Sequence, residues 1–174
     1  MNLLKRITYK ETFINNEPPH KSARVVLLDD NDKVAVIYVG KANFYTLPGG
    51  GIEEGETPEQ AAIREMKEET GCNSEIIHTL GIIEENSKTV NWNGLATGFM
   101  SKVKGSKGTP HLTQEEIDED AQLQWYDVRE ALNIIENQDI SKVDDGIGLI
   151  IRERDVTLLN EAIKLLNEDG ALII

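Results

Sequence analysis

A proline followed by three glycines interrupts the chain at residues 47–51, Leu47-Pro48-Gly49-Gly50-Gly51, and this run constrains the fold more than any other segment. Because proline lacks a backbone donor and glycine has no side chain to pack, a strand is expected to end here. Thr57, Pro58 and Gln60 then supply the N-cap, first-turn proline and capping box of a helix. The sequence therefore predicts a glycine loop followed by a helix over residues 58–70.

Three carboxylates share one face of this predicted helix. Glu65, Glu68 and Glu69 stand at i, i+3 and i+4, within an arc of roughly 100°. Like charges at this spacing cost a few tenths of a kcal/mol per pair, so helix stability alone does not select them. Hard divalent cations take oxygen ligands, and Mg²⁺ is typically held by a few carboxylates together with phosphate and water. The pattern favours a cation site, with a merely solvated acidic face as the alternative.

The residues beside the carboxylates lead to two further expectations. We expect Ala61 and Ala62 to leave room for an ion, and Ile63 and Met66 to turn the opposite flank toward the core. In the glycine run, positive φ angles would let a phosphate or a metal approach bare peptide groups, whose carbonyls could supply an oxygen ligand.

The charge balance narrows the class of ligand. The formal net charge is −13, from 31 acidic and 18 basic residues, which argues against a protein that neutralises the phosphates of a long nucleic acid. A small polyphosphate is also anionic, so an acidic protein needs a cation between itself and such a ligand. We therefore expect a small phosphorylated ligand with a divalent metal, and no long nucleic acid.

Cysteine content and hydropathy indicate the compartment. The single Cys72 cannot form an internal disulfide, which favours a reducing, cytoplasmic location. No run approaches the roughly 18 apolar residues that a membrane span requires, and no apolar segment follows Lys5 and Arg6. Secretion and membrane insertion are both disfavoured.

Apolar periodicity predicts the remaining elements. Strands are expected at residues 24–28 and 33–39, as a hairpin, and at 75–83, 93–103 and 123–128. Residues 105–119 are polar and are expected to form a loop, whereas a helical segment is expected at about 144–168, with Asp155 as an N-cap. The length of 174 residues fits one domain, so the prediction is a single α/β domain with a mixed sheet between helices.

The segment 50–72 resembles the Nudix box. Gly50 is followed after five residues by Glu56, and after seven more by Arg64-Glu65-Met66-Lys67-Glu68-Glu69-Thr70-Gly71-Cys72. Cys72 is the one departure, because the family usually has an aliphatic residue there; cysteine is a small hydrophobe that keeps the packing role. The match covers only 23 residues, but the order of strands and helices around it agrees with the whole domain.

The resemblance implies a single-domain α/β/α sandwich and a hydrolase. It assigns Mg²⁺, with Mn²⁺ as a substitute, to Glu65, Glu68 and Glu69, assisted by a backbone carbonyl at Gly49 or Gly50. Arg64 and Glu56 would stabilise the loop and the helix. The implied reaction is attack of a metal-activated water on phosphorus, which cleaves a phosphoanhydride bond of a nucleoside diphosphate linked to another moiety.

The general base is left open among several glutamates. In many members of the family it lies in a loop before a late strand, where this chain has Glu115, Glu116 and Glu119, and Glu116 is the favoured residue. A solvated charge run is about as good an interpretation of this loop. Glu68 or Glu69 could serve as the base instead.

Rival functions and the substrate also stay open. A noncatalytic Nudix-like ligand-binding or regulatory module is the main alternative, although such modules commonly lose box carboxylates that are all present here. No proline occurs near Ser87, which weakens ADP-ribose as substrate and leaves nucleoside triphosphates, dinucleoside polyphosphates, nucleotide sugars and capped RNA ends. His20, His78 and His111 show no metal-ligand spacing. The apolar tail at residues 171–174 could pack on the core or form a homodimer.

Overall fold

The computed structural model describes residues 1–10, 17–143 and 146–168. The described residues form one mixed sheet of seven strands and four helices. The strands are β1 (Leu3–Tyr9), β2 (His20–Leu28), β3 (Lys33–Val39), β4 (Phe44–Thr46), β5 (Ser74–Ser87), β6 (Trp92–Val103) and β7 (Ala121–Asp127). The helices are α1 (Pro58–Thr70), α2 (Gln114–Asp118), α3 (Val128–Asn137) and α4 (Ile147–Glu168).

The strand order places β2 near the centre of the sheet. The order is β1-β5-β6-β2-β3-β4, and β7 pairs with β3. β1 runs parallel to β5 and β2 runs parallel to β6, whereas the other pairs are antiparallel. The predicted β2–β3 hairpin is present, as are strands at the other predicted positions. β1 and β4 were not predicted.

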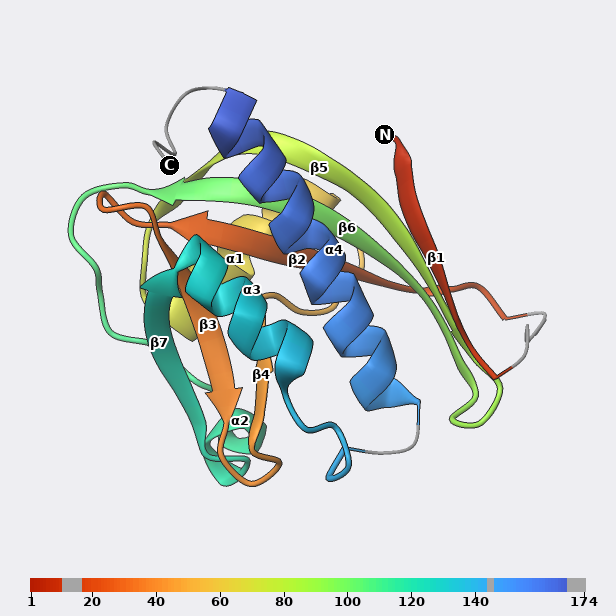
Figure 1. Ribbon diagram of the computed structural model, residues 1–174. Helices are drawn as coiled ribbons and strands as arrows, with labels where there is room; N and C mark the ends of the chain where they lie inside the picture. Colours follow the sequence, from red (N-terminus) through yellow and green to blue (C-terminus); the bar gives the residue numbers. More distant parts are fainter. Residues whose placement is uncertain (11–16, 144–145, 169–174) are drawn as a thin grey trace.

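Helices cover both faces of the sheet and make three layers. α3 and α4 lie across one face, and α1 lies behind the other (Figure 1). Along β2, Val26 and Leu28 point toward α3 and α4, while Val25 and Leu27 point toward α1. This alternation follows from the two-residue period of a strand, and burial of both faces explains the nearly continuous apolar run. The predicted α/β/α sandwich with a mixed sheet is confirmed.

Helix α1 begins and ends where its local signals place it. The Thr57 side chain accepts from the backbone of Gln60, and the Gln60 side chain accepts from the backbone of Thr57. Gly71 ends the helix with φ 69°, a conformation that glycine adopts without steric cost. Cys72 is fully buried in the core beneath α1, in the packing role that an aliphatic residue would have.

The prediction for the flanks of α1 was correct for Met66, which is fully buried, and wrong for Ala61, Ala62 and Ile63. Ala61 and Ala62 are buried in the core rather than beside a ligand space, and Ile63 is 47% exposed rather than directed inward. The small alanines, together with Met66, form the face that packs on β2, because short side chains let a helix approach a sheet closely. Cation binding therefore falls to the flank that carries the glutamates.

The predicted N-cap role of Asp155 was also wrong. α4 begins at Ile147, and Asp155 lies inside it, with no exposed surface. Its Oδ2 accepts from Thr46 Oγ1 at 2.8 Å and from the Leu47 backbone N–H at 2.9 Å, and its Oδ1 accepts from Arg154 Nε at 2.7 Å. The carboxylate thus fastens α4 to the segment that enters the glycine loop. Residues 144–145 of the predicted helical segment lie outside the described residues.

Two other boundaries differ from the sequence prediction. The expected loop at residues 105–119 contains α2, which starts with a second capping box between Thr113 and Glu116. Val128 begins α3 instead of ending a strand. Within the described ranges, no helix is long and apolar enough to cross a membrane.

Candidate active site

The glycine loop is packed so tightly between β2 and α1 that a side chain would not fit at Gly49 or Gly50. Gly49 has φ 132°, and a Cβ there would lie 2.2 Å from the carbonyl oxygen of Ala23. A Cβ on Gly50 would lie 2.2 Å from Oε1 of Glu65. Backbone bonds from Ala23 N to Gly50 O and from Val25 N to Pro48 O, both 3.0 Å, hold the loop along β2. The loop is therefore a fixed part of the site.

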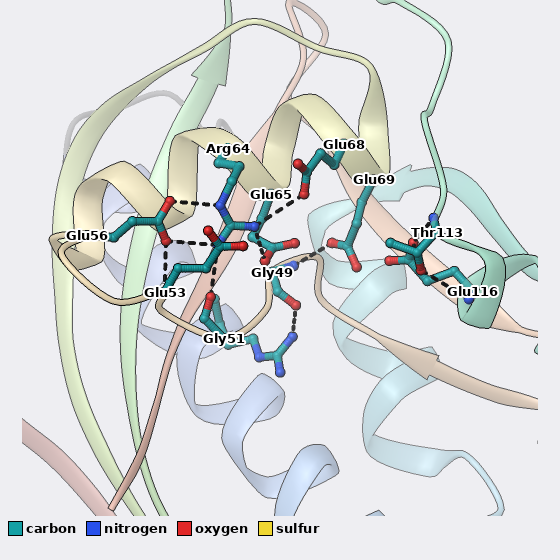
Figure 2. A network of polar contacts seen from close by, with 11 residues as sticks. Gly49, Gly51, Glu53, Glu56, Arg64, Glu65, Glu68, Glu69, Thr113 and Glu116 are labelled. Carbon is teal, nitrogen blue, oxygen red and sulfur yellow. Dashed lines mark hydrogen bonds and ion pairs between the residues drawn. The ribbon is translucent and has the colours of Figure 1, made fainter.

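Arg64 joins the loop to the acidic face of α1 (Figure 2). Its Nε and Nη2 donate to the two carboxylate oxygens of Glu56 at 2.8 and 2.9 Å, and Nη2 also donates to Gly51 O at 2.9 Å. Nη1 lies 2.7 Å from Glu65 Oε1 and 3.2 Å from Glu68 Oε2. The hydrogen bonds from Arg64 lower the pKa of Glu56 to about 2, and those bonds raise the pKa of Arg64 itself, chiefly through Glu56.

Glu69 is the box carboxylate that bonds directly to the glycine loop. Its Oε2 accepts a 2.6 Å hydrogen bond from the Gly49 N–H. Burial raises its pKa to about 8, although the Gly49 bond and the charge of nearby Arg24 oppose that shift. Burial also raises the pKa of Glu65, against the hydrogen bond from Arg64. Both raised pKa values indicate that the nearby positive charge does not offset the burial of these two carboxylates.

The carboxylates line a cleft of about 690 Å³ between α1, the glycine loop and the segment that enters α2. Its acidic lining residues are Glu53, Glu65, Glu68, Glu69, Glu115 and Glu116. Among the described residues of this lining, Arg64 is the only lysine or arginine. An anionic ligand would be repelled here unless cations accompany it.

The donor set fits a hard divalent cation. Carboxylate and carbonyl oxygens are the ligands that Mg²⁺ and Mn²⁺ prefer. The Gly50 carbonyl accepts from Ala23 N–H and the Gly49 carbonyl accepts from Arg24 Nη1, so each keeps one lone pair for a further partner. Within the described residues, no three acidic, histidine or cysteine side chains yet converge on one point. Each of the three box carboxylates bonds through one oxygen to Arg64 or to Gly49, which leaves its other oxygen for a cation.

The structure brings two of the three candidate base residues to the cleft. Glu115 and Glu116 line it, whereas Glu119 is the C-cap of α2 and lies outside the lining. Oε2 of Glu116 accepts from the Thr113 backbone N–H at 2.6 Å and from Thr113 Oγ1 at 2.8 Å (Figure 2). Glu116 is thus both the favoured base and the cap of its own helix.

The segment before α2 is held against the rest of the site. Lys107 Nζ lies 2.6 Å from Asp29 Oδ2 and 3.6 Å from the ring centre of Trp125. The backbone N–H of His111 donates to Glu68 O at 2.7 Å, and the His111 side chain lines the cleft. His111 was interpreted from sequence as an ordinary surface histidine, and neither its spacing nor that of Lys107 signalled this arrangement.

A buried charged group behind the glycine loop was missed by the sequence analysis. Arg24 donates to the Gly49 carbonyl, and Arg154 pairs with Asp155 and with Glu85. Arg154 and Glu85 are almost wholly buried. Arg24 carried a usable signal, because it directly precedes the apolar run of residues 25–28. Glu85 carried none, because it stands in the polar stretch of residues 84–88.

Comparisons with known proteins agree with this geometry. A model of the NUDIX domain matches residues 18–145. An RNA pyrophosphohydrolase of Brucella ovis is 42% identical over 53 residues, which are 30% of this chain and 27% of that protein. The chain spans less than half the length of the curated relatives it matches, 29% of one from Caenorhabditis elegans and 43% of one from Bacillus subtilis.

Solved structures show the same fold. A NUDIX-family hydrolase from Clostridium perfringens aligns over 86% of this chain and 99% of its own, with a TM-score of 0.54 and 23% identity. A MutT protein from Methanosarcina mazei Go1 aligns over 87% and 99%, with a TM-score of 0.59 and 13% identity. At these identities the likeness concerns the fold alone.

Proposed function

The chain belongs to the Nudix family, and from that premise we propose that it is a Mg²⁺-dependent pyrophosphohydrolase that cleaves a phosphoanhydride bond of a nucleotide derivative. The observation that carries the proposal is the cleft, where six carboxylates face one arginine beside a rigid glycine loop. Such a lining suits a diphosphate only when divalent cations lie between the ligand and the protein.

We assign the cation to Glu65, Glu68 and Glu69, with the Gly50 or Gly49 carbonyl as a further ligand. When bound, Mg²⁺ would neutralise phosphate oxygens and make the attacking water more acidic; Mn²⁺ could replace it. The chain's own residues set the geometry. Arg64 holds α1 to the loop through Glu56 and Gly51, so the carboxylates and the loop carbonyls keep a fixed separation.

Glu116 is the proposed general base. It lines the cleft, and its negative charge is one cause of the raised pKa of Glu69. The two carboxylates therefore lie close enough to interact. Both of its bonds with Thr113 use Oε2, so Oε1 is left to accept the proton of a water molecule. Glu68 and Glu69 are the alternatives, because one of them could serve as base while the others hold the cation.

The substrate is proposed to be small. The cleft's acidic lining and the net charge of −13 disfavour a long nucleic acid. The Brucella ovis relative is named for an activity that also cleaves a phosphoanhydride bond.

We also propose that residues 1–174 act as one domain. A cytoplasmic location is proposed because the single cysteine, Cys72, is free and buried. The homodimer stays a prediction, since residues 169–174 lie outside the described residues.

Hydrolysis of a compound panel tests the function. Phosphate or pyrophosphate release would be measured on nucleoside triphosphates, nucleotide sugars and dinucleoside polyphosphates, with Mg²⁺, with Mn²⁺ and with EDTA. Glu69→Gln should lower turnover roughly hundredfold or more, while Glu59→Gln, on the exposed first turn of the same helix, should leave it unchanged. Ligand binding with no metal-dependent turnover on any compound would favour a noncatalytic ligand-binding module instead.

A further inference from the structure

The acidic cleft offers few hydrogen-bond donors to a phosphorylated ligand. With the three box glutamates assigned to a cation, the side chains of the described lining that carry N–H or O–H groups are those of Arg64, Thr113 and His111. A cation neutralises only the phosphate oxygens that it touches, and charged oxygens elsewhere on the ligand are stabilised by donors from the protein. The contacts of a substrate therefore depend on which of these three side chains has a donor to give.

Arg64 has every donor engaged. A guanidinium carries five N–H groups, and this one makes five hydrogen bonds. Two of them go to Glu56, one goes to the Gly51 carbonyl, and one goes to each of Glu65 and Glu68. A phosphate oxygen could take one of these donors only by breaking a contact that joins α1 to the glycine loop or to its own carboxylates.

Thr113 is engaged as well. Its hydroxyl donates to Glu116 Oε2 at 2.8 Å, and the same hydroxyl accepts from the Glu116 backbone N–H at 3.3 Å. Both bonds belong to the capping box that starts α2. The remaining donor is the imidazole of His111, whose ring makes no hydrogen bond or ion pair with the part of the chain that the structure describes.

Backbone contacts fix the position of His111 beside the cation site. Its N–H donates to Glu68 O at 2.7 Å. Three residues earlier, a Cβ on Gly108 would lie 2.2 Å from Gly71 O, and a Cβ on Gly71 would lie 2.4 Å from the carbonyl carbon of Thr109. Two residues without side chains thus let the segment lie directly on the last turn of α1. The His111 side chain leaves this fixed backbone and lines the cleft.

The imidazole suits a phosphate oxygen better than it suits the cation. Mg²⁺ prefers oxygen ligands, so His111 is not expected to join the glutamates around it. An imidazole ring has at least one N–H donor in its neutral and in its protonated form, so its ability to donate does not depend on its charge. His111 is exposed, and its ring can turn toward a ligand without losing a partner inside the protein.

We propose that His111 binds the substrate through a hydrogen bond from its ring to a phosphate oxygen that the cation leaves free. This inference rests on the proposed function, because it assumes a cation-bound diphosphate in the cleft. The contact recognises the diphosphate itself and does not distinguish between the groups attached to it.

Binding of imidodiphosphate in the presence of Mg²⁺ tests the contact without hydrolysis, because this diphosphate analogue has no P–O–P bond. The chain has three histidines, and His111→Asn identifies the ring signals of His111 in NMR spectra. Imidodiphosphate should shift these signals saturably. The ring signals of His78, which lies on β5 and outside the cleft lining, should not move.

Substitutions of His111 measure the size of the effect by calorimetry. His111→Ala should weaken the binding of imidodiphosphate roughly tenfold and leave the affinity for Mg²⁺ alone unchanged. Asparagine places an amide N–H near the position of Nδ1 and glutamine places one near Nε2, so His111→Asn or His111→Gln should restore most of the affinity. His78→Ala is the matched control and should change neither affinity.

The possible results separate this contact from the proposed function. Unchanged imidodiphosphate affinity in His111→Ala, or no recovery in either amide variant, would overturn the contact. A parallel loss of Mg²⁺ affinity would overturn it too, because His111 would then belong to the cation site. Imidodiphosphate that binds the native chain without moving the His111 signals would overturn this inference alone. No binding to the native chain with Mg²⁺ present would also overturn the diphosphate site of the proposed function.

Discussion

The backbone N–H of Gly49 donates a 2.6 Å hydrogen bond to Oε2 of Glu69 and thereby joins the glycine loop to the last turn of α1. Here the contact is direct, because Gly49 has a positive φ and carries no Cβ. The backbone therefore sets the relative position of the loop carbonyls and the helix carboxylates.

Replacement of Gly50 by alanine should impair the cation site without unfolding the protein. The new Cβ would lie 2.2 Å from Glu65 Oε1, so the carboxylate must move. We expect Gly50→Ala to weaken Mg²⁺ activation roughly tenfold or more, as measured by the Mg²⁺ dependence of hydrolysis. Gly51→Ala is the comparison, because its Cβ would have its nearest neighbour, a carbon of His20, at 3.7 Å. Equal effects of the two substitutions would contradict the steric argument.

The Glu56–Arg64 pair should stabilise the fold only above a defined pH. The hydrogen bond from Arg64 lowers the pKa of Glu56 to about 2 in the folded state, against about 4.3 in the unfolded chain. A depressed carboxyl pKa adds stability above the unfolded value, and this stability is lost as pH falls from about 4.3 toward 2. The thermal midpoint of the protein should exceed that of Glu56→Gln at pH 7, and the gap should close toward pH 2. A gap that is the same at both ends of this range would refute the linkage.

Lys107 should act on turnover through the position of α2. It holds the loop before α2 by contacts with Asp29 and Trp125, and that loop leads to Glu116. Lys107→Met should lower kcat several-fold with little change in KM, since small displacements of a catalytic group reduce rate more than affinity. Lys107→Arg should restore much of kcat because it keeps the positive charge over the ring. Lys104→Met, which breaks an exposed pair with Glu75, should have no effect on either constant.

Asp155 should be among the most sensitive positions outside the cleft. Asp155→Asn removes a fully buried negative charge and leaves the guanidinium of Arg154 without its closest partner. We expect a loss of about 3 kcal/mol in the free energy of unfolding, measured by chemical denaturation. Glu161→Gln, on the same helix with a 3.4 Å pair to Lys164, should cost less than about 0.5 kcal/mol. A cost for Asp155→Asn as small as that would mean that α4 and the loop are joined by other contacts.

Local signals explain which elements were predictable. Every determinant of α1, from the Thr57 capping box to the stop at Gly71, lies within the helix or beside it, so its bounds followed from sequence. The second capping box, Thr113 with Glu116, obeys the same rule and could have been found. It was overlooked because α2 lacks an apolar stripe, having no buried residue.

Long-range pairing explains what could not be predicted. Asp155 has the local signature of an N-cap, yet its hydrogen-bond partner Leu47 is 108 positions away in the chain. β1 pairs in parallel with β5, and parallel strands are not joined by a short turn that could be recognised in the sequence. Arg24 resembles a solvent-facing strand residue until α4 covers it. Glu65, Glu68 and Glu69 could be singled out because their spacing falls within a single helix.

The hydrogen bonds of Asp155 also bear on the order in which the protein becomes competent during synthesis. The carboxylate that fixes Leu47 and Thr46 belongs to α4, which lies beyond the matched segment of residues 18–145. A nascent chain exposes the glycine loop long before it exposes that helix, and domains complete their folding only when all contacting segments have left the ribosome. The loop therefore reaches its final shape only after α4 has left the ribosome, and incomplete chains that end before α4 are not expected to show the proposed hydrolysis.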